Sequence, residues 1–247
     1  MTLDSSISLD LLVAHRGLQA RFPENTILGL NKAIEYGAKF IELDIQFSND
    51  CLPIIYHDSD LQRVSGCSGT ILDYSRQELL KLPAHEPQRL GNSFKSETIA
   101  PLEALVNILQ QHPKVTAFVE LKEESIAHCG RETMLDSVLK ILEPVQQQSV
   151  IISYDYRLVL MAKQRQWSKV GIVLKQWQDL NTEIVQNTTS DFIFVDYEKI
   201  PDEIADIKMT KAPLVAYEVG DKQLGKQLLN MGVTMLETFE LEQLSQS

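Results

Sequence analysis

The stretch that decides the fold lies at residues 40–58 and reads FIELDIQFSNDCLPIIYHD. It contains two β-branched runs that are separated only by the short segment 46–52. Parallel strands need a crossover of about a dozen residues or more, which this segment cannot supply. The turn residues Ser, Asn and Asp at 48–50 favour an antiparallel return instead. In that pairing Asp44 lies nearly opposite His57, so a histidine folds back towards an acidic strand.

Outside this hairpin, extended and helical patterns alternate along the chain. The extended candidates lie at 11–15, 40–45, 53–57, 116–121, 150–153, 171–174, 192–195, 214–217 and 233–236. The helical patterns lie at 26–37, 99–111, 131–147, 157–166, 180–187 and 222–231. Such alternation is typical of a parallel sheet with helices outside it. With 53–57 set aside as the antiparallel return, eight strands remain, and we predict an α/β fold of the TIM-type (β/α)8 barrel class.

The chain length of 247 residues suits one barrel, and we expect residues 1–247 to form a single domain. Residues 58–98 have weak periodicity and are rich in proline, glycine, serine and histidine. They predict an insertion after the second barrel strand, with one short helix near 75–82. Its position directly after His57 favours a cap or lid that contacts the substrate.

The net charge of −11 and the apolar content of 44% are those of an acidic globular protein. This charge disfavours nucleic acid and anionic membrane surfaces as partners. No apolar run is long enough for stable membrane insertion, and the first residues, MTLDSS, lack the features of a secretory signal. The three scattered cysteines, Cys51, Cys67 and Cys129, are expected to be reduced and to act as small, buried or half-buried apolar residues. We therefore expect a cytoplasmic protein, and the sequence makes no prediction of its oligomeric state.

Three acidic side chains are candidates for a metal site. Glu42 and Asp44 are two residues apart on one predicted strand, so they point to the same face. Glu120 repeats the pattern on the next barrel strand, where Lys122 points to the same face as Glu120. Three carboxylates make a hard oxygen site, which suits Mg²⁺ or Ca²⁺ better than Zn²⁺. The alternative is a salt-bridged barrel rim, for example Glu120 with Lys122.

Two histidines end strands beside these acids. His15 ends the first strand and His57 ends the hairpin return. Histidine exists in both protonation states near neutral pH, so a pair can serve as general base and general acid. The alternative for each is a hydrogen-bonded structural histidine. The other three histidines (His85, His112 and His128) lie in polar contexts and are expected at the surface.

Further charged and polar residues lie at the ends of predicted strands. Arg16 could grip a phosphate through two hydrogen bonds, or pair with Glu24 or Glu42 instead. Glu24 could cap the following helix or orient Arg16 or the metal. The late strands end in Tyr217-Glu218 and in Glu237-Thr238, and Tyr217, Glu218 and Glu237 are candidates for the substrate rim.

In this order the motifs resemble those of the glycerophosphodiester phosphodiesterase family. They are HRG at 15–17, PENT at 23–26, ELD at 42–44, PIIYHD at 53–58 and FVELK at 118–122. The resemblance implies a TIM-type barrel, a divalent cation, and hydrolysis of a small glycerophosphodiester to sn-glycerol 3-phosphate and an alcohol. Matched positions imply His15 and His57 as the acid/base pair, Glu42, Asp44 and Glu120 as metal ligands, and Arg16 and Lys122 as phosphate contacts.

The late strands depart from this family pattern. The family usually carries a Trp-Thr-Val-Asn-like run where this chain has Ala216-Tyr217-Glu218-Val219. The family's last strand usually ends in a Thr-Asp pair, where this chain has Glu237-Thr238. These departures concern substrate choice more than the hydrolytic residues, since Glu218 would add negative charge near an anionic substrate.

Other readings of the same residues stay open at this point. A lysophospholipase D-like phosphodiesterase would need an apolar groove beneath the 58–98 insertion. A metal-dependent aldolase or lyase on a barrel would not need His57. A noncatalytic phosphate-binding barrel would bind ligand without forming product. Fold alone does not separate these functions, and the joint set of histidines and carboxylates favours the hydrolase.

Overall fold

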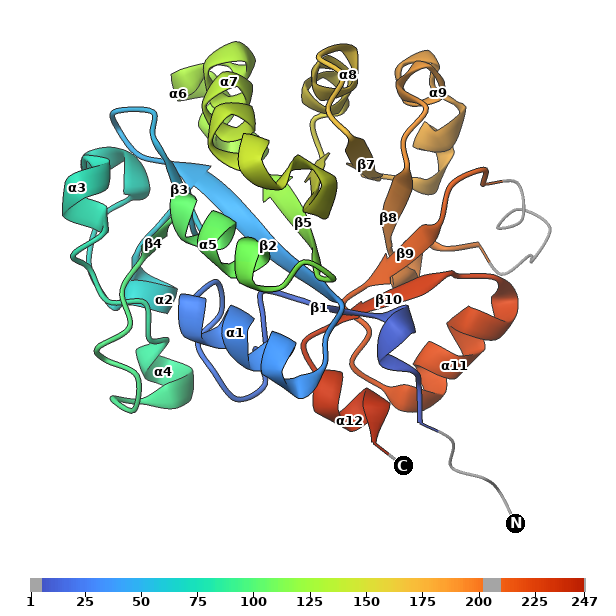
Figure 1. Cartoon of the computed structure of the whole chain (residues 1–247), viewed down its shortest axis with the longest axis horizontal. Helices are drawn as coiled ribbons and strands as arrows, with labels where there is room; N and C mark the ends of the chain where they lie inside the picture. The colour runs from blue at the N-terminus through green and yellow to red at the C-terminus, as the bar shows by residue number, and fades with distance from the viewer. Residues whose placement is uncertain (1–5, 202–209, 247) are drawn as a thin grey trace.

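A closed barrel of parallel strands forms the centre of the computed structural model, which describes residues 6–201 and 210–246 (Figure 1). Its first strand, β1 (Leu12–Ala14), pairs in parallel with both β2 (Phe40–Phe47) and β10 (Met235–Thr238), which closes the ring. The other barrel strands are β5 (Thr116–Leu121), β6 (Ser149–Ser153), β7 (Lys169–Val173), β8 (Phe192–Asp196) and β9 (Leu214–Tyr217). The predicted TIM-type (β/α)8 barrel is thereby confirmed.

Helices surround the barrel because each crossover between parallel strands returns on its outer face (Figure 1). They are α1 (Ile27–Tyr36), α5 (Glu103–Gln111), α7 (Arg131–Leu142), α8 (Tyr156–Gln164), α9 (Glu183–Thr188), α11 (Lys222–Met231) and the terminal α12 (Leu241–Ser245). Two apolar layers result. A larger layer lies between strands and helices, and a smaller one fills the barrel interior, where Phe118 contacts Phe192 and Phe194 edge-on.

Several element boundaries differ from prediction for local reasons. The helix expected at 99–111 begins only at Glu103, because β4 (Ala100–Pro101) pairs with β3 (Pro53–Ile55). The helix expected at 131–147 ends at Leu142 and continues as the 3-10 helix η4 (Glu143–Gln148), where Pro144 supplies no backbone N–H. The last strand extends to Thr238, which places Glu237 inside it.

The antiparallel return predicted after β2 is present. Ile45 pairs with Ile55, and the Tyr56 backbone N–H donates to the Asp44 carbonyl at 2.9 Å. Asp44 therefore lies opposite Tyr56, one residue short of the expected His57. The shift leaves His57 just beyond the pairing, where its carbonyl accepts a hydrogen bond from Gln46 Nε2 at 2.9 Å.

The insertion at 58–98, which we call the cap, contains more structure than predicted. Its elements are α2 (Gln62–Ser65), the 3-10 helix η2 (Ile71–Asp73), α3 (Arg76–Leu79) and α4 (Pro87–Leu90), gathered beyond β2 at one side of the barrel (Figure 1). Its apolar residues, including Leu61 and Leu79, form a separate cluster with Tyr56 of the hairpin. His85 is buried within the cap, so the expectation of a surface position is wrong for this histidine, whereas His128 is exposed as expected.

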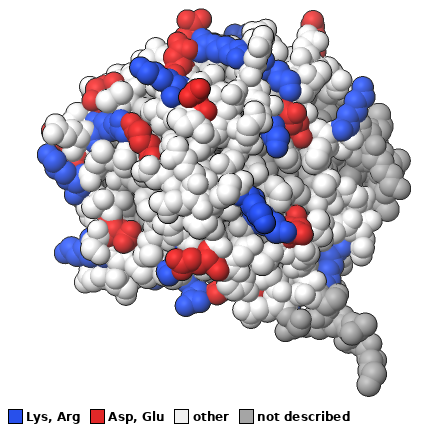
Figure 2. All heavy atoms as spheres, in the orientation of Figure 1, with Lys and Arg blue, Asp and Glu red and all other residues white. Residues whose placement is uncertain are grey.

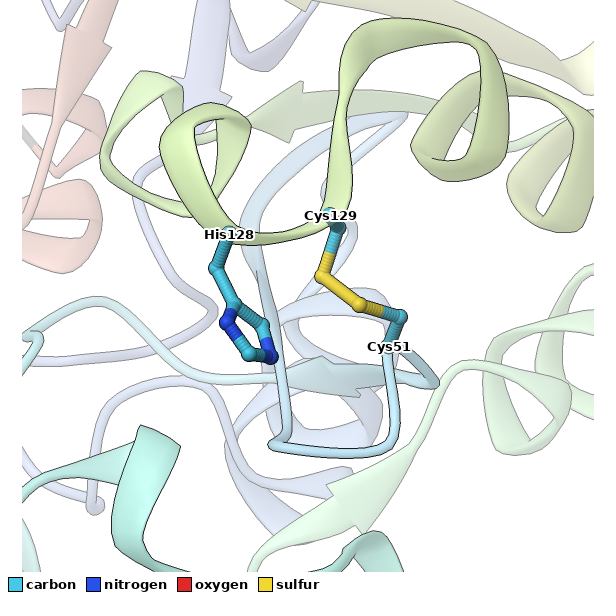
Figure 3. Close-up of side chains that lie close together, drawn as sticks. All are labelled: Cys51, His128 and Cys129. Atoms are coloured by element: carbon cyan, nitrogen blue, oxygen red, sulfur yellow. A yellow bond between two sulfur atoms is a disulfide. The ribbon is translucent and has the colours of Figure 1, made fainter.

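The prediction of reduced cysteines is wrong for two of the three. Cys51 in the β2–β3 turn and Cys129 at the end of α6 (Ile126–Cys129) form a disulfide with a Cα–Cα distance of 5.6 Å (Figure 3). The two residues are 78 apart in sequence, so their spacing carries no signal that the fold brings them together. Cys67 is a free, half-buried thiol as expected. The cytoplasmic location stays a prediction.

Charges of both signs are dispersed over the face in Figure 2, where Lys and Arg alternate with Asp and Glu among uncharged residues. Although the chain carries a net charge of −11, this face shows no continuous acidic or basic patch. Among the described residues, no helix combines the length and apolar character needed to cross a bilayer.

Candidate active site

A strained turn after β1 places two functional side chains at the barrel mouth. Arg16 has a φ of 52° and Gly17 a φ of 91°, both in the left-handed region. A Cβ on Gly17 would lie 2.6 Å from the backbone carbon of Gly29 in α1, so only glycine fits there. The His15 N–H donates to the Thr238 carbonyl at 3.0 Å. These contacts explain the HRG sequence as a turn that fixes His15 and Arg16.

Three carboxylates converge at the same mouth. Asp44 on β2 is in register with Glu120 on β5, and Glu42 lies two residues earlier on β2. One oxygen from each of the three lies within 4.8 Å of the others. Glu42 is 1% exposed, and its Oε1 atom has no hydrogen-bond partner among the described residues. A buried carboxylate oxygen without a partner is costly, and three oxygen donors fit a hard divalent cation.

Buried cations balance part of this charge. Arg16 lies between Asp44, with 3.0 Å from Nε to Oδ2, and Glu24, with 3.1 Å from Nη1 to Oε1. Lys122 Nζ lies 2.9 Å from Glu120 Oε1 and 3.5 Å from Asp44 Oδ1. The ion pairs weighed as alternatives for Arg16 with Glu24 and for Lys122 with Glu120 therefore both occur, within the acidic cluster itself.

The carboxylates differ in electrostatic environment. Burial alone would raise the pKa of Asp44, but Arg16 and Lys122 hold it below its usual range. Burial raises the pKa of Glu42 well above its usual range, and the neighbouring charges of Asp44 and Glu237 add to this shift. Burial also raises the pKa of Glu120, against the opposing effect of Lys122. A cation among these oxygens would favour their ionised forms.

His15 faces carboxylates from two strands. Its Nε2 lies 3.3 Å from Glu237 Oε1 and 3.8 Å from Glu42 Oε2. Burial lowers the pKa of His15 well below 6.5, and the Arg16 charge lowers it further. His15, Glu42 and Glu237 also form a compact set of donors within 4.8 Å, which shares Glu42 with the all-oxygen set.

His57 is held from the cap side. Its Nδ1 lies 2.6 Å from Asp58 Oδ1, and Arg63 donates to both oxygens of Asp58. Arg63 also donates to both oxygens of Glu24, at 2.7 and 2.8 Å. Gln46 of β2 donates to the His57 carbonyl, which keeps the histidine at the end of the strand that carries Glu42 and Asp44. Cap and barrel mouth are thus joined by one ionic network.

Asn25, Asp58, Arg63 and Glu86 are site residues that the sequence did not single out. Asn25 bonds both to the Asp44 carboxylate at 2.8 Å and to the Asp44 N–H at 3.0 Å. Asn25 and Asp58 lie within the PENT and PIIYHD motifs, and this position could have identified them as site residues. Arg63 and Glu86, which accepts from the Glu24 N–H at 2.8 Å, lie in the irregular cap and had no such signal.

The residues predicted for the substrate rim differ in their exposure to solvent. Glu237 is buried against His15, whereas Glu218 is exposed, with a φ of 38°. The hydroxyl groups of Tyr217 and Tyr154 lie 2.6 Å apart, and burial raises the pKa of Tyr217 to about 12. Beside Tyr154 lies a cleft of about 310 Å³, lined by Glu120, Lys122, Glu123, Glu124, Tyr154, Lys175 and Lys199.

Sequence comparison finds relatives among the glycerophosphodiester phosphodiesterases. Glycerophosphodiester phosphodiesterase 1 of Mus musculus is 34% identical over 128 residues, which cover 52% of this chain and 36% of the mouse protein. The glycerophosphodiester phosphodiesterase of Caldanaerobacter subterraneus subsp. tengcongensis is 29% identical over 164 residues, or 66% of each chain. The chain spans 36–49% of the length of the mammalian relatives it matches.

Solved structures share the fold. A phosphodiesterase of Oleispira antarctica, solved in complex with the product sn-glycerol-3-phosphate, has a TM-score of 0.83 at 23% identity and covers 94% of both chains. The glycerophosphodiester phosphodiesterase of Thermotoga maritima has a TM-score of 0.71 at 21% identity, over 94% of this chain and 96% of that one. The model of the glycerophosphoryl diester phosphodiesterase family matches residues 15–238, from His15 to Thr238, and the chain belongs to this family.

Proposed function

We propose that this protein is a phosphoric diester hydrolase that cleaves glycerophosphodiesters to sn-glycerol 3-phosphate and an alcohol. The observation that carries the proposal is the convergence of Glu42, Asp44 and Glu120 at a barrel mouth that also holds His15 and Arg16. The names of the relatives support this reaction class, as does the product bound by the Oleispira antarctica phosphodiesterase.

Glu42, Asp44 and Glu120 would hold a divalent cation, Mg²⁺ or Ca²⁺, with their buried oxygens. A bound cation at this position supplies positive charge next to the phosphate and stabilises negative charge on its oxygens. Arg16 and Lys122, which already lie among these acids, would contact the phosphate from either side. With a divalent cation bound, its charge together with those of Arg16 and Lys122 would exceed the three negative charges of Glu42, Asp44 and Glu120.

His15 and His57 would move the protons. We assign His15, beside Arg16, as the base that removes a proton from the nucleophile. His57 would donate a proton to the leaving alkoxide, and the Asp58 carboxylate at its Nδ1 would orient Nε2. The nucleophile is either the 2-hydroxyl of the substrate, which would give a cyclic phosphate, or water. Detection of a cyclic phosphate intermediate distinguishes the two.

A lipid-like diester is less well supported as the substrate. That reading needs an apolar groove beneath the cap. Apart from the edge-on contact of Phe94 with Phe22, the described contacts between the cap and the loop after β1 are polar, with Arg63 paired to Glu24 and Arg89 donating to the Gln19 and Phe22 carbonyls.

Product analysis on a panel of glycerophosphodiesters, with and without a chelator, tests the proposal. We expect sn-glycerol 3-phosphate from at least one diester, its loss on chelation, and its recovery on addition of Mg²⁺ or Ca²⁺. His15→Ala and His57→Ala should each lose most turnover, by about 10²–10⁴-fold, while circular dichroism shows a retained fold. Near-normal turnover in either variant would contradict the acid/base assignment, and binding without product over hours would contradict the hydrolase.

A further inference from the structure

The disulfide lies beside a third side chain of metal-binding type. His128 precedes Cys129 at the end of α6, and its ring lies next to the Cys51–Cys129 bridge (Figure 3). One ligand atom from each of Cys51, His128 and Cys129 lies within 4.8 Å of the others. His128 Nε2 also lies 2.8 Å from the Asn49 carbonyl, which holds the ring against the β2–β3 turn.

The chemistry of this set differs from that of the active site. Two thiolates and an imidazole are soft or intermediate ligands, which select Zn²⁺ over Mg²⁺ or Ca²⁺. Around Zn²⁺ the bonds to sulfur are about 2.3 Å and those to nitrogen about 2.0 Å, so such ligands stand about 3.3–3.8 Å apart. The three ligand atoms already lie within 4.8 Å of one another, so after reduction the two sulfurs need only move apart from bonding distance to reach this spacing. His128 is exposed and the cysteines are half-buried, so a small thiol and a cation can reach them.

We propose that Cys51, His128 and Cys129 bind Zn²⁺ when their disulfide is reduced, so that one surface cluster alternates between a disulfide and a metal site. In the reductive step a dithiol transfers two electrons and two protons to the bridge, the S–S bond breaks, and the dithiol becomes a cyclic disulfide. Both cysteine thiols then release a proton as their sulfurs bond to Zn²⁺. Water completes the coordination, as in three-ligand zinc sites.

Either state links the same two segments of the barrel. Cys51 lies in the turn between β2, which carries Glu42 and Asp44, and β3. Cys129 follows β5, which carries Glu120. A covalent or metal-mediated link between them restrains the segments that follow the two strands carrying all three acids. The proposal concerns a second site and does not depend on the proposed hydrolase activity.

Spectroscopy with Co²⁺ as a stand-in for Zn²⁺ tests the proposal on the full chain. After reduction and removal of the reductant, Co²⁺ should produce the intense thiolate-to-cobalt absorption that oxygen ligands do not give, and Zn²⁺ should displace it. The active-site carboxylates can also bind Co²⁺, but they cannot produce this band. The oxidised protein should lack the band, and alkylation with mass spectrometry should find one reactive cysteine before reduction and three after it.

Variants identify the ligands. Cys51→Ser and Cys129→Ser should each abolish the band of two thiolates, whereas Cys67→Ser, which alters the one free cysteine, should keep it. His128→Ala should weaken Zn²⁺ binding at least about tenfold, since the loss of even an outer-shell partner typically costs that much. Absence of the band in the reduced wild-type protein, or its loss in Cys67→Ser, would overturn the site. Unchanged affinity in His128→Ala would remove His128 from it.

Discussion

The two halves of the barrel mouth differ in kind. The ends of β10, β1, β2 and β5, which we call the acidic wall, carry Glu237, His15, Glu42, Asp44 and Glu120. The opposite half, which we call the tyrosine wall, carries Tyr154 after β6 and Tyr217 at the end of β9. On the acidic wall a substitution changes the balance of buried charges, whereas on the tyrosine wall it removes a neutral hydrogen bond. We infer that the acidic wall performs the chemistry and the tyrosine wall adjusts substrate choice.

The largest effect should follow Asp44→Ala. The change removes one of the three proposed metal-binding carboxylates and leaves Arg16, Lys122 and Asn25 without a shared partner. We expect turnover to fall by about 10³-fold. We also expect the free energy of unfolding to fall by about 3 kcal/mol, because removing one partner of a buried ion pair leaves the other charge buried without compensation. Product assays and urea unfolding measure the two effects.

Glu42→Gln provides the matched control for this variant. Glu42 Oε1 has no partner among the described residues, and its neighbours Asp44 and Glu237 are acids. The substitution should therefore lower turnover by no more than Asp44→Ala does, yet leave the metal-free protein as stable as the wild type or more so. Equal destabilisation by both variants would show that the acids act structurally and would remove the contrast within the acidic wall.

Asp58→Asn should have the next largest effect. Asp58 does not reach the acidic cluster itself but orients His57 through a 2.6 Å contact to Nδ1. Replacing its charge should lower kcat about 10- to 100-fold and leave KM nearly unchanged, as for other residues that hold a catalytic ring. The exposed neighbour Asp60 supplies the control, because Asp60→Asn should leave both constants unaltered. A larger change in KM than in kcat would argue against a positioning role.

The acidic wall was largely predictable from sequence, and the reason is geometric. Glu42 and Asp44 alternate with apolar residues on one strand, so their common face follows from the strand period alone. Glu237 was recognised only as a rim candidate, because its burial depends on the register of β10 against β1. The contact of Arg63 with Glu24 joins residues 39 apart in sequence, and Arg63 lies in an irregular segment without periodicity.

The same limit explains the errors. His85 was placed at the surface because its neighbours are polar, but the cap forms a small core that encloses it. The Cys51–Cys129 bridge joins two loops that only the pairing of β2 with β5 brings together. Local patterns predicted the strands and most of the helices, whereas contacts between loops required the assembled barrel.

On the tyrosine wall, Tyr217→Phe should change activity by less than about tenfold, the equivalent of one neutral hydrogen bond. The variant removes the contact between the Tyr217 and Tyr154 hydroxyls at 2.6 Å and leaves the acidic wall unaltered. We expect kcat/KM to shift among diesters with different alcohols. Tyr154→Phe should match it, and the double variant should show no further loss if this hydrogen bond is the cause. A loss as large as that of Asp44→Ala would place chemistry on the tyrosine wall.

The smallest effect concerns an ion pair behind the tyrosine wall. Asp155, the N-cap of α8, accepts two hydrogen bonds from Arg131, at 2.9 and 2.6 Å. Burial alone would raise the pKa of Asp155, but its bonds with Arg131 and with the Leu158 N–H lower it. Asp155→Asn keeps a capping side chain and loses the charge, so we expect a stability loss of about 0.5–1 kcal/mol at pH 7 and unchanged turnover.

The pH dependence of stability separates the effect of the Asp155 charge from that of its N-cap hydrogen bond to α8. Because the pKa is lower in the folded state, the ionised carboxylate stabilises the fold above the unfolded value of about 3.9. The stability difference between wild type and Asp155→Asn should therefore be constant from pH 7 to about pH 5 and shrink as the pH falls below about 4. Urea unfolding across this range measures it. A difference that grows with acidity would mean that the carboxylate opposes folding. A difference that does not change with pH would assign the loss to weaker N-capping of α8 by asparagine. The ion pair between Asp155 and Arg131 would then contribute nothing measurable, in contrast to the ion pairs of the acidic wall.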